Sequence, residues 1–264
     1  MTETASRTEG ELIPWYLTGA TALVCAMVLL LMAALGPMGT GDIVYRTSES
    51  ALYQNQGQDL ADIFLIAPLL LIGGLLQLRR RDSAKYLLVL TPVTLMYTGL
   101  SLGIGQEWNT YPGNVESYFW LFLTLIVGGL VLLVGTLSQF TAADAPRFDR
   151  KGLRAFVILT GLALLLFAGM WIGQVNQVIA TGDLSDSSYS DAPNVFWVIR
   201  YLDLGISMPV GFLALFLLWS RPERAYGLVL LFFGFFITMA VTVNAMALVQ
   251  VLNADPATAS MGPG

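Results

Sequence analysis

Seven long apolar stretches dominate this sequence of 264 residues and limit what the chain can fold into. A helix needs about 20 mostly apolar residues to cross the hydrocarbon core of a bilayer, which is about 30 Å thick. Inside that core the backbone amides find no water, so they must be satisfied within helices. The sequence therefore predicts an all-α polytopic transmembrane bundle with seven spans, at about 13–35, 63–78, 86–104, 118–140, 153–175, 195–220 and 225–252.

Composition supports lipid as the solvent of this chain. Only 12% of the residues are charged, whereas a soluble domain carries about 25% charged residues. The longest gaps between spans, at 36–62 and 176–194, are rich in small polar residues, as loops are. We therefore expect one transmembrane bundle over residues 1–252 and a disordered tail at 253–264. The apolar run of the first span exceeds a signal-peptide core, so we expect this span to be retained, with cleavage as the alternative.

Charge divides the loops into two classes. The loops at 79–85, 147–154 and 221–224 follow spans two, four and six, and with Arg7 they hold 11 of the 13 basic residues. The opposite face holds 11 of the 18 acidic residues. Short cytoplasmic loops are enriched in Lys and Arg. We therefore predict a multi-pass protein of the cell membrane with a cytoplasmic N-terminus and an extracytoplasmic C-terminus.

The residue types that are missing argue against several classes of chemistry. The chain has no histidine, which is the commonest metal ligand and a common general base. Its one cysteine, Cys25, lies in an apolar run and is predicted to be a small buried hydrophobe. The seventh span has no lysine for a retinal Schiff base, and nucleotide-binding motifs are absent. With a formal net charge of −5, we predict no nucleic-acid partner, no metal and no cofactor, and we rank a membrane-embedded enzyme last.

Two segments of the chain share a pattern of aspartate and proline. Asp62 and Pro68 in the second span have the same spacing as Asp203 and Pro209 in the sixth, and each span leads to an arginine-containing loop. An ancient duplication, as in many transporters, would produce this pattern, and so would chance similarity between apolar helices. A proline inside a helix removes a hydrogen bond, so we expect kinks at Pro68, Pro92 and Pro209, as static features or as a gate. Close helix packing is predicted at Gly73, Gly74, Gly128, Gly129 and Gly161.

Charged residues within the spans are the candidates for a functional site. A charge near the bilayer centre costs at least about 2.5 kcal/mol and usually faces the bundle interior. Arg200 and Asp203 lie three residues apart, on one face of span six and in its outer half. They form either a self-neutralising pair or a ligand pocket in which Arg200 faces an anionic group and Asp203 a cationic one. Other residues predicted at similar depth complete the candidate ligand-binding set: Asn244, Gln174, Asn176, Tyr97, Asp62 and Glu116.

Two parts of the chain resemble a group of uncharacterised bacterial multi-pass membrane proteins. They are the region from Asp62 to Tyr97, with Ala67-Pro68-Leu69-Leu70 and the basic loop, and the segment Tyr201–Gly205 that leads to Pro209. The resemblance covers about a third of the chain. It implies a multi-pass fold of about seven helices and no particular chemistry, and it adds interest to Asp203 and Pro209.

Two functions remain open at this point. The first is a small-molecule or ion transporter, or a ligand-binding membrane protein, with the polar residues of the outer half as its site. The second is a non-catalytic accessory or scaffold subunit of a larger membrane complex. The expected partners are membrane lipid, an unidentified small molecule or ion, and other membrane subunits or further copies of the chain.

Overall fold

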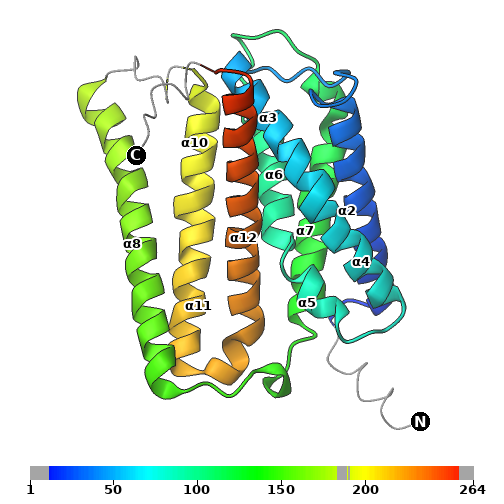
Figure 1. Cartoon of the computed structure of the whole chain (residues 1–264), viewed down its shortest axis with the longest axis vertical. Coiled ribbons are helices and arrows are strands. Elements are labelled where there is room, and N and C mark those ends of the chain that lie inside the picture. The colour runs from blue at the N-terminus through cyan, green and yellow to red at the C-terminus, as the bar shows by residue number, and fades with distance from the viewer. Residues whose placement is uncertain (1–11, 183–188, 190, 256–264) are drawn as a thin grey trace.

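The computed structural model describes residues 12–182, 189 and 191–255, and within them it has seven helical spans long and apolar enough to cross a membrane. The spans lie side by side with their axes roughly along one direction (Figure 1). The predicted all-α seven-helix bundle is therefore confirmed. Several spans combine more than one helical segment. The segments are α2 (Trp15–Leu35), α3 (Glu49–Ala61), η1 (Asp62–Ile66), α4 (Ala67–Leu78), α5 (Ala84–Leu88), α6 (Pro92–Ile104), η2 (Val115–Tyr118), α7 (Phe119–Leu137), η3 (Ala142–Asp144), α8 (Arg150–Thr181), α10 (Pro193–Leu202), η4 (Asp203–Ser207), α11 (Met208–Ser220) and α12 (Pro222–Leu252).

The second span begins earlier than hydropathy predicts. The expected loop over 36–62 is wrong for its second half, because α3 begins at Glu49 and continues through η1 into α4. Ser48 caps the helix by accepting a hydrogen bond from a first-turn amide at 3.2 Å. The polar α3 packs against α12 so closely that a Cβ on Gly57 would lie 2.3 Å from the Cα of Met246. Helix packing and a cap therefore set this boundary, and hydropathy does not detect either of them.

Both aspartate–proline segments contain a π-helical turn. In η1 and in η4, an amide donates to the carbonyl of the aspartate five residues earlier, Asp62 or Asp203. Pro68 and Pro209 follow in the first turn of the next α-helix. A proline ring clashes with the carbonyl four residues before it and donates no hydrogen bond, and a wider turn accommodates both defects. A π-turn therefore precedes each of these two prolines, and the predicted kinks of the helix axis stay a prediction.

The third span is interrupted before its proline. α5 ends at Leu88 and α6 begins at Pro92. The hydroxyl of Thr91 donates to the Leu88 carbonyl at 3.0 Å and satisfies one acceptor that the break exposes. Glycines of two neighbouring spans approach this break: a Cβ on Gly129 would lie 2.8 Å from the Pro92 carbonyl oxygen, and one on Gly234 would lie 2.4 Å from a Cα atom in the break. The break is thus enclosed by α7 and α12.

Most of the glycines predicted to mark close packing do so. A Cβ on Gly128 of α7 would lie 2.2 Å from the sulfur of Cys25 in α2, and Cβ atoms on Gly73 and Gly74 would lie within 3.0 Å of side chains or backbone of neighbouring elements. Cys25 is fully buried, as predicted. Gly161 of α8 does not fit the prediction, because the nearest atom to its Cβ would be 3.8 Å away.

The seven spans differ in how tightly they are held. α2 packs against α4 and α7, and α6 packs against α7, so the first four spans form one group. α12 joins this group to the rest through its contacts with α3, α6 and α11. α8 stands at the edge of the bundle (Figure 1), contacts mainly α11 and η4, and has one fully buried residue, Leu164. α8 is therefore the most loosely packed of the described spans.

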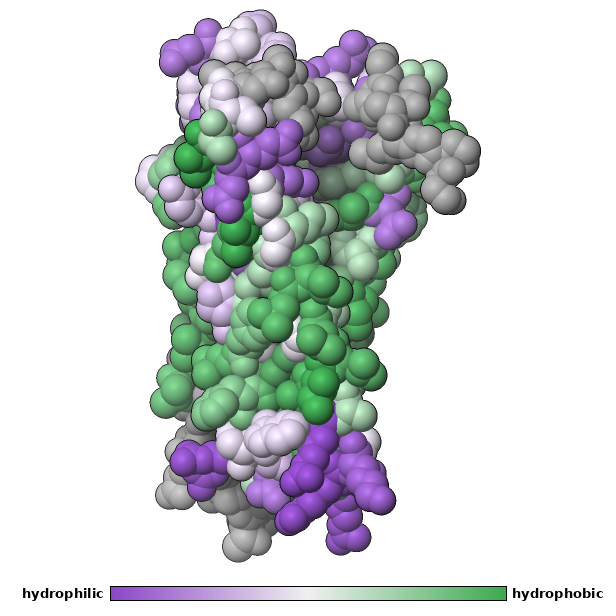
Figure 2. Space-filling view, turned by 90° about the vertical axis from the view of Figure 1, so that its left-hand side faces the viewer, coloured by the Kyte–Doolittle hydropathy of each residue, from purple (hydrophilic) through white to green (hydrophobic). Residues whose placement is uncertain are grey.

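Charge and hydropathy divide the molecule along its long axis. The loops that join α4 to α5, α7 to α8 and α11 to α12 all lie at one end (Figure 1), and we call this the basic end. Figure 2 shows an apolar belt between hydrophilic groups at the two ends. This segregation agrees with a protein that spans a bilayer, while the side on which the basic end lies stays a prediction. The predicted disordered tail falls mostly outside the described residues.

Candidate functional site

The guanidinium of Arg200 in α10 is buried between two aromatic rings. Its central carbon lies 4.3 Å from the ring centroid of Trp171 in α8 and 3.6 Å from that of Phe196. One Nη donates to the side-chain oxygen of Gln174 in α8, and the other donates to the Phe196 carbonyl at 3.3 Å. The Nε atom is buried and has no acceptor within the described residues. The stacking fixes the plane of the guanidinium, and the Nε–H within that plane has no acceptor among the described residues.

The carboxylate of Asp203 is held from two other spans. Asp203 is the first residue of η4 and only 7% of its surface is exposed. The indole nitrogen of Trp171 donates to it at 2.8 Å. The hydroxyl of Tyr97 in α6 interacts with the same carboxylate, and the Tyr97 ring packs on Phe235 of α12 at a centroid distance of 5.5 Å. Asp203 therefore connects spans three, five and six.

Arg200 and Asp203 do not neutralise each other by direct contact. Within the described part of the chain, ion pairs join Arg46 to Glu116 and Lys85 to Asp144, and none joins Arg200 to Asp203. Both charged groups instead bond to neutral partners, among them Trp171 and Gln174 of α8, and the Nε–H of Arg200 stays without an acceptor within the described residues. A buried guanidinium that lacks a contacting carboxylate keeps its attraction for anions. Both the ligand pocket and the self-neutralising pair stay predictions.

The structure brings some of the predicted residues into this cluster and places others outside it. Gln174 and Tyr97 contact Arg200 and Asp203 respectively. Asn244 and Asn176 have exposed side chains, and Asn244 donates to the carbonyl four residues earlier in α12 at 2.7 Å. We define the Arg200 cluster as Arg200, Asp203, Trp171, Gln174 and Tyr97.

Sequence analysis missed Trp171, which contacts both charged residues. A usable signal is present: Trp171 and Gln174 are three residues apart, as are Arg200 and Asp203. Residues three apart share a helix face. When two antiparallel helices each carry such a pair, both residues of one pair can therefore lie beside the residues of the other pair. The equal spacing of the two pairs therefore indicates that Trp171 contacts the charged pair, and neither span gives this indication alone.

Asp62 belongs to a second polar cluster, away from Arg200. It is buried in η1 and accepts a hydrogen bond from Gln58 of α3 at 2.9 Å. Asp59, one turn earlier, is also buried, and one of its carboxylate oxygens has no hydrogen-bond donor within the described residues. The prediction that Asp62 shares a site with Arg200 and Asp203 is not supported by these contacts.

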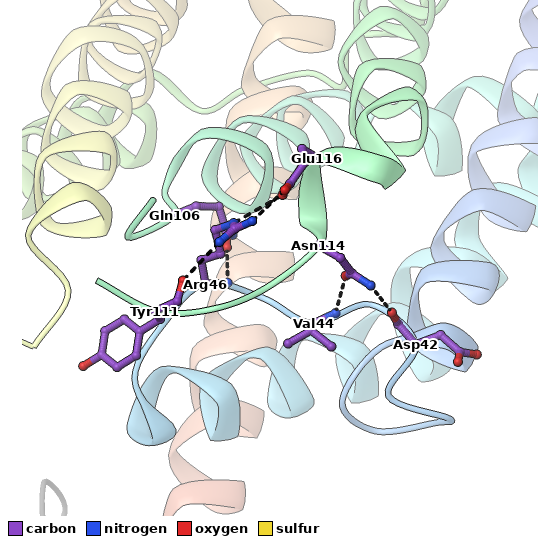
Figure 3. Close-up of polar contacts among 7 residues, drawn as sticks. All are labelled: Asp42, Val44, Arg46, Gln106, Tyr111, Asn114 and Glu116. Carbon is purple, nitrogen blue, oxygen red and sulfur yellow. Dashed lines mark hydrogen bonds and ion pairs between the residues drawn. The ribbon is translucent and has the colours of Figure 1, made fainter. Parts of the chain in front are cut away.

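Glu116 lies in a network of loops at the end opposite the basic end, shown in Figure 3. Its carboxylate forms an ion pair with Arg46 at 2.6 Å. Arg46 also donates to the Tyr111 carbonyl at 3.2 Å, and its amide donates to Gln106 at 2.7 Å. Asn114 bridges the same two loops through the amide of Val44 and the carbonyl of Asp42, both at 2.9 Å. Glu116 therefore joins loops and does not contact the Arg200 cluster.

The start of α10 is attached to the end of α6. The buried carboxylate of Glu107 accepts a hydrogen bond from the amide of Asn194 at 2.7 Å, and the Asn194 side chain donates to the Gln106 carbonyl at 2.7 Å. These bonds fix the first turn of α10, and with it the helix face that carries Arg200.

No protein-family model, curated protein or solved structure matches this chain. The resemblance to bacterial multi-pass proteins therefore stays a prediction.

Proposed function

We propose that the Arg200 cluster is a binding site for a small molecule or ion that carries an anionic group, in a transporter or ligand-binding protein of the cell membrane. The observation that carries this proposal is the buried Nε–H of Arg200, which has no acceptor within the described residues. An unsatisfied hydrogen bond from a charged group costs more than the about 1–3 kcal/mol of a neutral one. An anionic oxygen at this position would remove that cost.

Two features of the structure around Arg200 support the proposed binding site. Asp203 lies one helical turn away, so a ligand with an anionic and a cationic group would find a partner for each. α8, which supplies Trp171 and Gln174, is the most loosely packed span and can move with little loss of buried surface. Movement of this helix would open a path to the cluster.

Ligand-dependent thermal stability tests the proposal. Purified protein in detergent is titrated with a panel of the twenty amino acids and with chloride, sulfate and phosphate. We expect at least one compound to raise the apparent Tm of the wild type and of Asn244→Ala, a control from the same depth in α12. The response should be lost in Arg200→Gln and reduced in Gln174→Ala. A compound whose effect is unchanged in Arg200→Gln would show that it binds elsewhere.

An accessory or scaffold role is the second candidate, and α8 favours it. Much of the surface of α8 is exposed and apolar, for example Leu166 at 77% exposure. Gly169 and Gly173 have the spacing of a helix-association motif, and a Cβ on either would meet nothing within 4 Å. The mass of the gently solubilised protein separates the two roles, because a strict monomer contradicts the scaffold role.

A further inference from the structure

The basic end contains a cleft that the Arg200 cluster does not involve. It has a volume of about 700 Å³ and lies between the start of α8, the end of α11 and the start of α12. Six of the residues that line it determine its chemistry: Arg150, Arg154, Arg221, Arg224, Glu223 and Trp219. The cleft thus gathers residues from three helix ends, of which the start of α8 is far from the other two in the sequence.

The charge of this cleft is strongly positive. Four arginines and one glutamate leave a net charge of +3. Within the described part of the chain, no carboxylate forms an ion pair with any of these four guanidinium groups. Arg154 instead lies over the ring of Trp219, with its guanidinium carbon 5.6 Å from the ring centroid. The cleft therefore presents guanidinium groups whose hydrogen-bond donors are available to an anion.

Two helices begin at the cleft, and the start of α12 adds to its positive potential, whereas the carboxylate of Asp149 caps the start of α8 by accepting from the Gly152 amide at 2.9 Å. α8 begins at Arg150 and α12 begins at Pro222, and both residues line the cleft. No side chain caps the first turn of α12. The amide groups of a helix start carry a partial positive charge and favour phosphate. Arginine matches the geometry of phosphate oxygens through its planar pair of donors.

We propose that this cleft binds a phosphate group, supplied by the headgroup of an anionic lipid or by a soluble phosphate compound. The lipid is the source that the surroundings favour. Trp219 is half exposed beside the arginines, and indole rings prefer the interface between headgroups and acyl chains. Figure 2, which views the α8 side, shows hydrophilic residues directly below the apolar belt. Basic pockets between spans at this level bind lipid headgroups in other membrane proteins. The site is independent of the function proposed for the Arg200 cluster.

The test uses the full-length protein in phosphatidylcholine nanodiscs with two probes. Cardiolipin, added to the nanodisc lipid, represents the headgroup source, and pyrophosphate in the buffer represents the soluble source. Native mass spectrometry measures retained cardiolipin, and thermal unfolding measures stabilisation by either probe. The variants are the cleft double mutant Arg154→Gln/Arg221→Gln and the control double mutant Arg79→Gln/Arg81→Gln. The control removes the same charge from the same end of the molecule.

We expect the wild type and the control to retain cardiolipin and the cleft variant to bind it about tenfold more weakly. Stabilisation by pyrophosphate alone, lost in the cleft variant, would support the site and identify a soluble ligand. Equal losses in both double mutants, or no binding of either probe by the wild type, would overturn the proposal. If the cleft variant does not purify as a folded species in phosphatidylcholine, Arg150→Gln/Arg224→Gln replaces it under the same criteria.

Discussion

The side chains of Lys85 and Asp144 form a largely enclosed ion pair at the basic end. Their N···O distance is 2.6 Å, and they are 10% and 16% exposed. Asp144 also accepts hydrogen bonds from the hydroxyl of Tyr86 at 3.1 Å and from the amide of Thr141 at 2.8 Å. Burial alone would raise the pKa of Asp144, but the hydrogen bond from Lys85, the bonds from Thr141 and the charge of Lys85 together lower it. The carboxylate thus fixes the loop after α7 to the start of α5.

This pair predicts a stability that depends on pH. A carboxyl group whose pKa is lowered by folding stabilises the protein above its ordinary pKa of about 3.9, and that contribution is lost as the pH falls through the folded value. We expect Asp144→Asn to lower the free energy of unfolding at pH 7 by about 2 kcal/mol. The difference from wild type should shrink as the pH is lowered from 5 to 3. Thermal unfolding over this range measures it, with Glu223→Gln as a control at the same end. A difference that stays constant with pH would contradict the assignment.

Among the polar residues predicted beside Arg200, the sequence could not show which of them face the cluster. Gln174 and Tyr97 were expected beside Arg200 because all lie at one level of the bundle, and they do contact the cluster. Asn244 and Asn176 were expected there for the same reason, and both are exposed. The level of a residue follows from counting along its helix, whereas its facing depends on how the helix is rotated against its neighbours. That rotation is set by packing between spans, which one sequence does not display.

At the level of whole helices, α2 and α7 approach each other where a glycine meets a cysteine. A Cβ on Gly128 would lie 2.2 Å from the sulfur of Cys25, and the next nearest atom would be 3.4 Å away. We expect Gly128→Ala to destabilise the protein by about 1–3 kcal/mol through overpacking. The same substitution should cost much less in a Cys25→Ala background, because the clashing atom is gone. Thermal unfolding of the four combinations gives the coupling energy.

Gly161→Ala is the matched control for that cycle. It lies in a helix with room for a methyl group, so the higher helix propensity of alanine should leave stability unchanged or raise it by up to about 1 kcal/mol. If the changes in unfolding free energy caused by Gly128→Ala and Cys25→Ala were additive, the proposed contact between these two residues would be contradicted.

The helices of the structure show which elements the apolar pattern of the sequence predicts and which it misses. All seven spans follow from runs of apolar residues. An irregular segment precedes each of the three prolines, Pro68, Pro92 and Pro209. The polar helix α3 was not predicted, because a helix covered by another helix needs no apolar run of its own. The matching π-turns at Asp62 and Asp203 agree with a duplication. They agree equally with the simpler cause that proline at the same spacing forces the same turn, so the origin of the repeat stays open.

The whole molecule separates its charges so clearly that orientation can be tested with single cysteines. In a Cys25→Ala background, we introduce cysteine at Ser83 in the basic loop after α4 or at Ser117 at the opposite end. With the basic end in the cytoplasm, a membrane-impermeant maleimide added to intact cells should label the Ser117→Cys protein and not the Ser83→Cys protein. Both should be labelled after permeabilisation, which controls for reactivity. The reverse pattern in intact cells would place the N-terminus outside.

The contact between α3 and α12 joins the second of the described spans to the seventh. Their backbones meet at Gly57 and Met246, and Gln250 of α12 donates to Ser50 of α3 at 3.1 Å. Because translation delivers α12 after the other six described spans, α3 lacks this contact while those spans are synthesised. A nascent chain that stops short of α12 would therefore keep the surface of α3 around Gly57 and Ser50 uncovered.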